Sequence, residues 1–291
     1  MCALKVFGTR AGAGELVSRW TAMNSNPANT GNESPVNHMS HHYDREFFDF
    51  VEGSAGRSAR PFLNSFVQVA FGGAPPTSVL DVGCASGVWL AEWSHIGVKE
   101  VVGVDKDYVP RSKLAIPAGA FRAVDISQPF DLRQHFDLVL CLEVAEHIPD
   151  AHSDTLIDNL CRHGDLIMFS AAIPGQGGEF HVNEQPYEYW RAKFAVRGYA
   201  VFDCARRPVA GLKEIEPWYR FNTFLFANED GQSRLSYSAR RDIVEASKPL
   251  EILAPWHWRM CCYVRSRLLS PFVSMLGCVG FKNRSEKDLG Q

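Results

Sequence analysis

The stretch SVLDVGCASGVWL, residues 78–90, decides the fold of this 291-residue chain. Its first five residues are apolar around one acid, as in a buried strand, and its last residues resume an apolar helical pattern. Between them lie Gly83 and Gly87, which let the backbone pass close to a ligand where a side chain would collide. This order predicts a strand, a ligand-binding loop and a helix.

Short β-branched or apolar segments alternate with helical patterns from this stretch onward. The segments that read as parallel strands are 78–82, 101–104, 136–141 and 166–170. Strands separated by helical crossovers build a parallel sheet with helices on its faces. Two further segments, 200–204 and 219–227, can pair as an antiparallel hairpin at one edge of the sheet. The pattern therefore predicts an α/β fold with a mostly parallel sheet.

The chain divides into three parts by composition. Residues 1–42 include a stretch rich in Asn, Ser, Pro, Gly and His, which buries too little apolar surface to offset the entropy of ordering. We expect this segment to be flexible. Residues 43–228 hold the predicted domain, which begins with two helical stretches, one around Phe47 and one from Phe62 to a break near Gly72. Residues 229–291 form a tail that we expect to be helical and docked.

The glycine loop and the acids near it resemble the first motifs of class I S-adenosylmethionine-dependent methyltransferases, in particular the ubiquinone-biosynthesis O-methyltransferase-like and polysaccharide-locus methyltransferase group. The resemblance implies a Rossmann-like three-layer sandwich with a seven-stranded, mostly parallel sheet and an antiparallel edge strand. It implies S-adenosyl-L-methionine as cofactor, with Asp105 on its ribose hydroxyls and Asp125 beside its adenine amino group. The cofactor-binding residues expected on this basis are Tyr43, Arg57, Asp81, Gly83, Cys84, Ala85, Gly87, Asp105, Asp125, Ile126 and Leu142.

A nicotinamide dinucleotide site is the competing interpretation of a glycine-rich loop after a strand. That site needs the spacing GxGxxG, but counting from Gly83 the later glycine positions hold Ala85 and Val88. The dinucleotide interpretation therefore fails on spacing. Ala85 also departs from the methyltransferase pattern, which usually has glycine there, so we expect the loop to be slightly tighter or shifted.

The segment Glu143-Val-Ala-Glu146-His147 follows a predicted strand directly, at the edge of the sheet where ligands bind in such folds. On a helical turn, residues 143 and 146 or 147 share a face. The segment is similar to the E-x-x-E-H segment of metal-dependent O-methyltransferases that act on ubiquinone precursors or on the terminal ribose of small RNAs. This similarity implies a Mg²⁺ or Mn²⁺ site formed by Glu143, Glu146, His147 and the later His181. The alternative is that the glutamates cap or solvate a helix and His147 packs beneath the cofactor.

His147 and His181 are also the candidate catalytic residues, because a neutral imidazole can remove a proton from an acceptor hydroxyl near working pH. For the methionine carboxylate of the cofactor, the candidates are Tyr43 and one of Arg57 or Arg60, since arginine suits a bidentate contact. The alternative is that both arginines are solvated surface residues that do not contact the cofactor.

Composition narrows the classes of partner and location. The formal net charge is -3, so a strongly basic surface is not expected; a DNA partner is not predicted and an RNA partner is disfavoured. The 8 cysteines are scattered and the N-terminus lacks the order of a signal peptide, which favours a cytoplasmic protein. The apolar run 268–281 is too short for a transmembrane helix, although peripheral membrane contact stays open.

The sequence thus predicts an S-adenosylmethionine-dependent methyltransferase that O-methylates a small-molecule or carbohydrate-like acceptor. Two alternatives stay open. One is a metal-assisted ribose 2'-O-methyltransferase acting on RNA, and the other is a non-enzymatic interaction module on the same fold.

Overall fold

The computed structural model describes residues 45–255 and Trp258, and a seven-stranded sheet runs through this part of the chain. The strand order is β3-β2-β1-β4-β5-β7-β6. Strands β1 to β5 pair in parallel, whereas β7 is antiparallel to both of its neighbours, β5 and β6. The strands are β1 (Ser78–Val82), β2 (Glu100–Asp105), β3 (Phe121–Ala123), β4 (Leu138–Leu142), β5 (Leu166–Ser170), β6 (Ala200–Phe202) and β7 (Phe224–Ala227). The predicted α/β fold, with antiparallel pairing at one end of the sheet, is confirmed.

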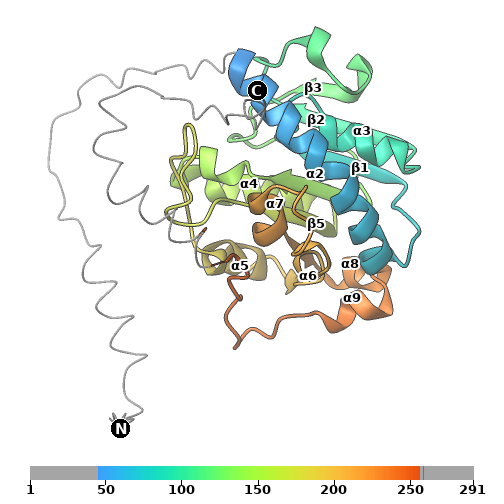
Figure 1. Cartoon of the computed structure of the whole chain (residues 1–291), viewed down its shortest axis with the longest axis vertical. Coiled ribbons are helices and arrows are strands. Elements are labelled where there is room, and N and C mark those ends of the chain that lie inside the picture. Colours follow the sequence, from blue (N-terminus) through green and yellow to red (C-terminus); the bar gives the residue numbers. More distant parts are fainter. Residues whose placement is uncertain (1–44, 256–257, 259–291) are drawn as a thin grey trace, which may run out of the picture. The chain divides into compact units, whose positions relative to one another are not determined.

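Helices lie against the sheet and connect its strands (Figure 1). Their bounds are α2 (Arg45–Phe71), α3 (Val88–His95), α4 (Ser153–His163), α5 (Tyr187–Ala195), α6 (Arg206–Val209), α7 (Pro217–Asn222), α8 (Glu229–Arg234) and α9 (Tyr237–Arg241). In α4, Leu156, Leu160 and His163 are buried at helical spacing, so this helix presents one covered face to the sheet.

Two hydrophobic clusters show that the sheet is the middle of three layers. Along β4, Leu138 and Leu140 join the cluster that contains residues of α2 and α3. Their neighbours Val139 and Cys141 join the cluster that contains residues of α4 and α5. Successive side chains of a strand point to opposite faces, so this alternation is expected for a strand covered by helices on both sides.

The order of the strands creates a switch point between β1 and β4. The chain runs from β1 outward to β2 and β3 and then returns to the other side of β1, where β4 pairs with it in parallel. In open α/β sheets, ligands bind at the carboxyl ends of the strands beside such a point. A ligand site is therefore expected at the loops that follow β1 and β4, which begin at Gly83 and Glu143.

Several predicted boundaries differ from the structure, two of them by the form of a whole segment. The two helical stretches before the glycine loop form one helix, α2, which continues through Pro61. Its buried residues Ala59, Phe62 and Leu63 lie on both sides of that proline, so packing outweighs the one backbone hydrogen bond that proline removes. The strand predicted over 219–227 begins only at Phe224, because Pro217 at the first position of α7 favours a helix over residues 217–222.

Several predictions concern residues outside the described range. Tyr43, the segment 1–42 and most of the segment after Ala254 belong to this group. The described start of the predicted tail is helical in α8 and α9, and Leu235 and Ala239 are buried in the same cluster as residues of α2. Within residues 45–255 and Trp258, no helix has the length and apolar character needed to cross a membrane.

Candidate active site

The loop after β1 has an unusual backbone that two glycines support. Gly83 has φ 85° and Gly87 has φ 81°, both in the region that favours glycine. A Cβ on Gly83 would lie 2.5 Å from a methyl group of Val144, so the loop after β1 packs directly against the segment that follows β4. Ala85 also has a positive φ, 46°, which explains why glycine is the usual residue at that position.

Asp105, at the end of β2, fixes the glycine loop. Its carboxylate accepts hydrogen bonds from the backbone N–H of Ala85 (2.8 Å) and of Lys106 (2.7 Å), and from the hydroxyl of Tyr108 (2.8 Å). The side chain is buried, and burial raises the pKa of Asp105 although these three donors oppose the shift. The carboxylate predicted to bind ribose hydroxyls therefore lies at the loop, with its oxygens turned toward polar hydrogens.

Asp81, within β1, is the second buried acid of this site. Burial, reinforced by the nearby charge of Asp105, raises the pKa of Asp81 to about 8. Cys84 is buried between the two acids and the strand, and its thiol contacts the position of Gly103 so closely that a Cβ there would lie 2.6 Å from the sulfur. The two acids lie on adjacent strands and give the site a poorly solvated acidic floor, on which Asp81 holds its proton at neutral pH.

Asp125 and two apolar residues complete the predicted cofactor set. Asp125 follows β3 and accepts hydrogen bonds from Ser127 N (3.0 Å) and Ser127 Oγ (2.6 Å), and its carboxylate lies 3.5 Å from Lys106 Nζ. Burial acts to raise the pKa of Asp125, but the hydrogen bonds from Ser127 and the charge of Lys106 outweigh it, so the pKa is lowered. Ile126 and Leu142 are buried. Tyr108, which contacts Asp105, and Lys106, which contacts both Asp105 and Asp125, were not among the predicted residues.

The two candidate arginines on α2 are each paired with a carboxylate. Arg57 Nη2 lies 2.8 Å from Glu216 Oε1, next to α7. Arg60 Nε lies 2.7 Å from Glu92 Oε2, on α3. Both arginine side chains are more than half exposed, which is consistent with the alternative that they are solvated surface residues. Tyr43, the third candidate for the methionine carboxylate, precedes the described residues.

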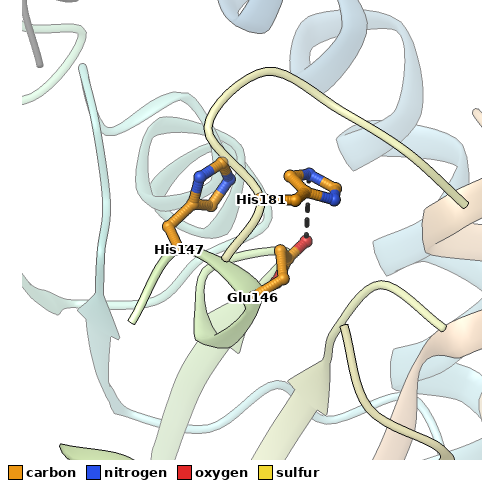
Figure 2. A group of neighbouring side chains, drawn as sticks. All are labelled: Glu146, His147 and His181. Atoms are coloured by element: carbon orange, nitrogen blue, oxygen red, sulfur yellow. Dashed lines mark ion pairs between the residues drawn. The ribbon is translucent and has the colours of Figure 1, made fainter. Parts of the chain in front are cut away.

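A second group of side chains lies beside the glycine loop, after β4. Ligand atoms of Glu146, His147 and His181 all lie within 4.8 Å of one another (Figure 2). Glu146 and His147 come from a one-turn 3₁₀ helix over Ala145–His147, and His181 comes from the loop between β5 and α5. The rings of the two histidines are perpendicular, with their centroids 4.9 Å apart. The backbone carbonyl of Glu146 accepts hydrogen bonds from Val182 N and Asn183 N, which hold the distant loop in place.

The Glu146 carboxylate is unusual because it is 1% exposed and neither oxygen has a hydrogen-bond partner of good geometry within the described part of the chain. This carboxylate forms a loose ion pair with His181, whose Nε2 atom lies 4.0 Å from Glu146 Oε1. Burial, together with the charge of Glu143, raises the pKa of Glu146 well above its usual range. A buried carboxylate with such weak hydrogen bonding is costly unless a proton or a cation neutralises it.

Glu143, the fourth residue of the predicted metal set, is directed into a different network. Glu143 Oε2 accepts from Gln176 Nε2 at 2.9 Å, and Oε1 lies 3.4 Å from Asn222 Nδ2. The prediction placed Glu143 on a helical turn with Glu146, but Glu143 has φ 56° and the following turn is 3₁₀. Three of the four predicted ligands are therefore together, and the Glu143 carboxylate is held by two amides.

Three further polar residues of this site were not among the predicted ones, namely Glu184, Gln176 and Asn222. Glu184 lies three residues after His181 and contacts its ring, with Oε1 2.9 Å from Nδ1. That short spacing was a signal that could have been used. Asn222 contacts Glu143 from 79 positions away, and no local pattern identifies such a pair.

Known proteins match the central part of the chain. Residues 53–191 match a sequence family described as a methyltransferase domain. The ubiquinone biosynthesis O-methyltransferase of Alkalilimnicola ehrlichii is 31% identical over 123 residues, which cover 38% of this chain and 47% of the relative. The relative of the same name in Escherichia coli O157:H7 is 31% identical over 140 residues, covering 42% of this chain and 57% of the relative. The chain spans about half the length of these curated relatives.

Solved structures with a similar chain path have lower sequence identity. The plantazolicin methyltransferase BpumL, in complex with SAH, matches with a TM-score of 0.47 and 13% identity over 64% of this chain and 92% of that one. A sugar N-methyltransferase from Streptoalloteichus matches with a TM-score of 0.44 and 16% identity over 78% of this chain and 98% of that one.

Proposed function

We propose that the methyltransferase domain formed by residues 53–191 makes this chain an S-adenosylmethionine-dependent O-methyltransferase that acts on a small-molecule or carbohydrate-like acceptor. The curated relatives named O-methyltransferases support the choice of oxygen as the methylated atom. A cytoplasmic location remains part of the same prediction.

One observation carries the proposal, namely the packing of Gly83 against Val144 at the switch point of the sheet. That contact places the loop anchored by Asp105 next to the turn that bears Glu146 and His147. A cofactor site and an acceptor site must adjoin for group transfer, because the reacting atoms have to lie in line and close together. The two candidate sites meet this condition within one domain.

The residues of the glycine loop fit S-adenosylmethionine. Positive φ values at Gly83, Ala85 and Gly87 curve the backbone around the ends of β1 and β2. Asp105 offers a buried carboxylate to hydroxyl donors, and its present partners include one hydroxyl, that of Tyr108. When bound, the cofactor supplies a methyl group attached to a positively charged sulfur. A positively charged ligand beside these buried acids would favour their ionised forms, so the site suits a ligand of that charge.

An acceptor hydroxyl must lose its proton when its oxygen is methylated. His181 is 12% exposed and faces His147, so both imidazoles lie at the boundary between the buried turn and the loop after β5. A neutral imidazole nitrogen within hydrogen-bond reach of the hydroxyl can take that proton. We assign the general-base role to this pair of histidines.

The same group of side chains fits a divalent cation. Glu146 would offer a carboxylate oxygen, and His147 and His181 would each offer a ring nitrogen. A cation would neutralise the buried Glu146 carboxylate, and it would lower the pKa of an acceptor hydroxyl beside it. With one carboxylate and two imidazoles, the donor set suits Mn²⁺ at least as well as Mg²⁺, which prefers oxygen ligands.

Calorimetric titration with S-adenosylmethionine tests the proposal. We expect saturable binding to the wild-type protein and a loss of about 10-fold or more in affinity for Asp105→Ala, because a charge-assisted hydrogen bond contributes about 1.5–3 kcal/mol. The matched control is Asp107→Ala, since Asp107 is 79% exposed and pairs only with Arg111 among the ion pairs of the described residues. Folded wild-type protein that binds no cofactor, with or without Mg²⁺ or Mn²⁺, would contradict the proposed function.

If binding is found, a screen of hydroxylated acceptors follows. Transfer of a radiolabelled methyl group to one acceptor class, in the presence and absence of a chelator, identifies the substrate and shows whether a cation takes part. Activity that survives complete removal of divalent cations would reject the cation and leave the histidine pair as the base.

A further inference from the structure

His181 has a second polar partner on the side of its ring that faces away from Glu146. Its Nδ1 atom lies 2.9 Å from Glu184 Oε1, whereas its Nε2 atom lies on the side of Glu146. The ring is thus placed between two carboxylates from different segments. Only one of the two, Glu146, belongs to the group of potential ligands described above.

The Glu184 carboxylate is itself held in a fixed orientation. Its Oε1 atom accepts a hydrogen bond from Gly177 N at 2.6 Å, and its Oε2 atom accepts one from Gly175 N at 2.7 Å. Hydrogen bonds from two backbone donors, one to each oxygen, favour the ionised carboxylate. An ionised carboxylate can only accept hydrogen bonds. The hydrogen between Glu184 and His181 must therefore belong to Nδ1.

The other nitrogen of the ring is consequently left with its lone pair. In a neutral imidazole one nitrogen donates and the other accepts, so a hydrogen on Nδ1 makes Nε2 the acceptor. Nε2 lies 4.0 Å from Glu146 Oε1. The loop backbone holds the Nε2 side of the ring toward Glu146, because Val182 N and Asn183 N donate hydrogen bonds to the carbonyl of Glu146. Gly178 packs so tightly on the ring that a Cβ there would lie 2.1 Å from Nε2.

We propose that Glu184 is a positioning residue that holds His181 in the tautomer with hydrogen on Nδ1 and thereby presents the Nε2 lone pair to the space shared with Glu146 and His147. A carboxylate behind a histidine commonly fixes the tautomer and increases the basicity of the opposite nitrogen. The assignment deepens the proposed function, on which its chemical purpose rests. The tautomer itself is a property of the protein without cofactor or acceptor.

Nitrogen NMR of histidine-labelled full-length protein tests this inference directly. We expect the neutral His181 ring of the wild-type protein to show the Nδ1–H tautomer, with its signals identified by their absence in His181→Gln. In Glu184→Gln, we expect a mixture of tautomers, because an amide offers one acceptor oxygen to the three donors that the carboxylate serves. Glu184→Asp, which keeps the charge, should restore part of the preference.

The matched control is Glu188→Gln. Glu188 is a neighbouring carboxylate that also accepts a backbone hydrogen bond, from Leu250 N at 2.7 Å, but it does not contact His181. An Nε2–H tautomer in the wild-type protein would overturn the inference, and this measurement needs no variant to fold. An unchanged tautomer in Glu184→Gln, or an equal change in Glu188→Gln, would overturn it as well.

Titration with Mn²⁺ alone, followed by electron paramagnetic resonance, gives a second readout. We expect Glu184→Gln to bind Mn²⁺ about 10- to 100-fold more weakly than wild type, the usual effect of removing a carboxylate behind a ligating histidine. Equal Mn²⁺ affinity in the two proteins would contradict the inference. If the wild-type protein binds no Mn²⁺, the cation part of the proposed function fails, and the tautomer measurement alone decides the role of Glu184.

Discussion

The backbone N–H of Ala85 donates a 2.8 Å hydrogen bond to the carboxylate of Asp105, which joins the glycine loop after β1 to the end of β2. The same carboxylate accepts from the hydroxyl of Tyr108. An acid that has been assigned to ribose hydroxyls thus already holds one hydroxyl of the protein. In the proposed function, the ribose hydroxyls of the cofactor would compete with Tyr108 for the oxygen atoms of this side chain.

Tyr108→Phe tests that competition. We expect the affinity for S-adenosylmethionine to rise by about 2- to 10-fold, because one neutral hydrogen bond of about 0.5–1.5 kcal/mol no longer has to be exchanged. Phenylalanine keeps the ring, so ring contacts remain. Calorimetry measures the change, with the exposed Tyr237→Phe as the control. A weaker affinity would show that the Tyr108 hydroxyl supports the cofactor and does not compete with it.

Ala85→Gly should leave the fold intact and make the protein slightly more stable. The left-handed backbone at φ 46° costs an alanine about 1–2 kcal/mol, and glycine loses about 0.5–1 kcal/mol through its greater freedom when unfolded. We expect a net gain of about 0–1.5 kcal/mol in the free energy of unfolding, measured with denaturant.

The control for this substitution is Ala91→Gly within α3. Alanine there has a helical backbone, so glycine should destabilise the protein by about 1 kcal/mol. Two alanine-to-glycine changes in the same region are thus expected to have opposite signs. A loss of stability in both variants would mean that the backbone at Ala85 is not strained.

The parts of the fold that were predicted correctly have local signals. The run from Ser78 to Leu90 combines a buried strand, a glycine loop and the start of a helix within 13 consecutive residues, and the structure places all of β1 and the first residues of α3 there. Strand and helix periodicities arise from neighbouring residues, so they can be recognised without knowledge of the rest of the chain.

The geometry of the candidate site depends on contacts that the local pattern does not contain. Helical spacing suggested that Glu143 and Glu146 share a face, but the positive φ at Glu143 turns its side chain toward Gln176 and Asn222. Asn222 is the last residue of the helix α7, and this part of the chain was predicted to be a strand. Side-chain direction at a strained residue is therefore set by tertiary packing, and sequence spacing alone does not determine it.

Gly178→Ala should displace His181 without changing any polar group. The new Cβ would lie 2.1 Å from Nε2 and 2.4 Å from Cε1, distances at which the ring must move. We expect Mn²⁺ binding and methyl transfer to fall by about 10-fold or more, because a site of this kind tolerates shifts of only about 0.5 Å. Circular dichroism should show an unchanged fold.

Gly56→Ala is the matched control for Gly178→Ala. Gly56 lies within α2, and a Cβ there would meet nothing within 4 Å. The substitution should stabilise the helix by up to about 1 kcal/mol and leave Mn²⁺ binding unchanged. If Gly178→Ala also leaves Mn²⁺ binding and methyl transfer unchanged, His181 is not part of the site.

Asp81 should make the stability of the protein depend on pH in a direction opposite to that of most carboxylates. Its pKa is raised to about 8 in the folded protein, chiefly by burial, against about 3.9 in the unfolded chain. Between these values the folded state binds a proton that the unfolded state does not bind. Because of this group, the free energy of unfolding decreases by about 1.4 kcal/mol per pH unit as the pH rises through that interval.

Asp81→Asn removes this contribution because an amide does not titrate. We expect the difference in unfolding free energy between Asp81→Asn and wild type to be constant below about pH 4, to shift in favour of the variant between about pH 4 and 8, and to level off above that range. Urea unfolding at several pH values measures it, with Asp107→Asn as the exposed control. Parallel curves for Asp81→Asn and wild type would mean that Asp81 is ionised in the folded protein throughout this interval, and that the floor of the glycine loop carries its full negative charge at neutral pH.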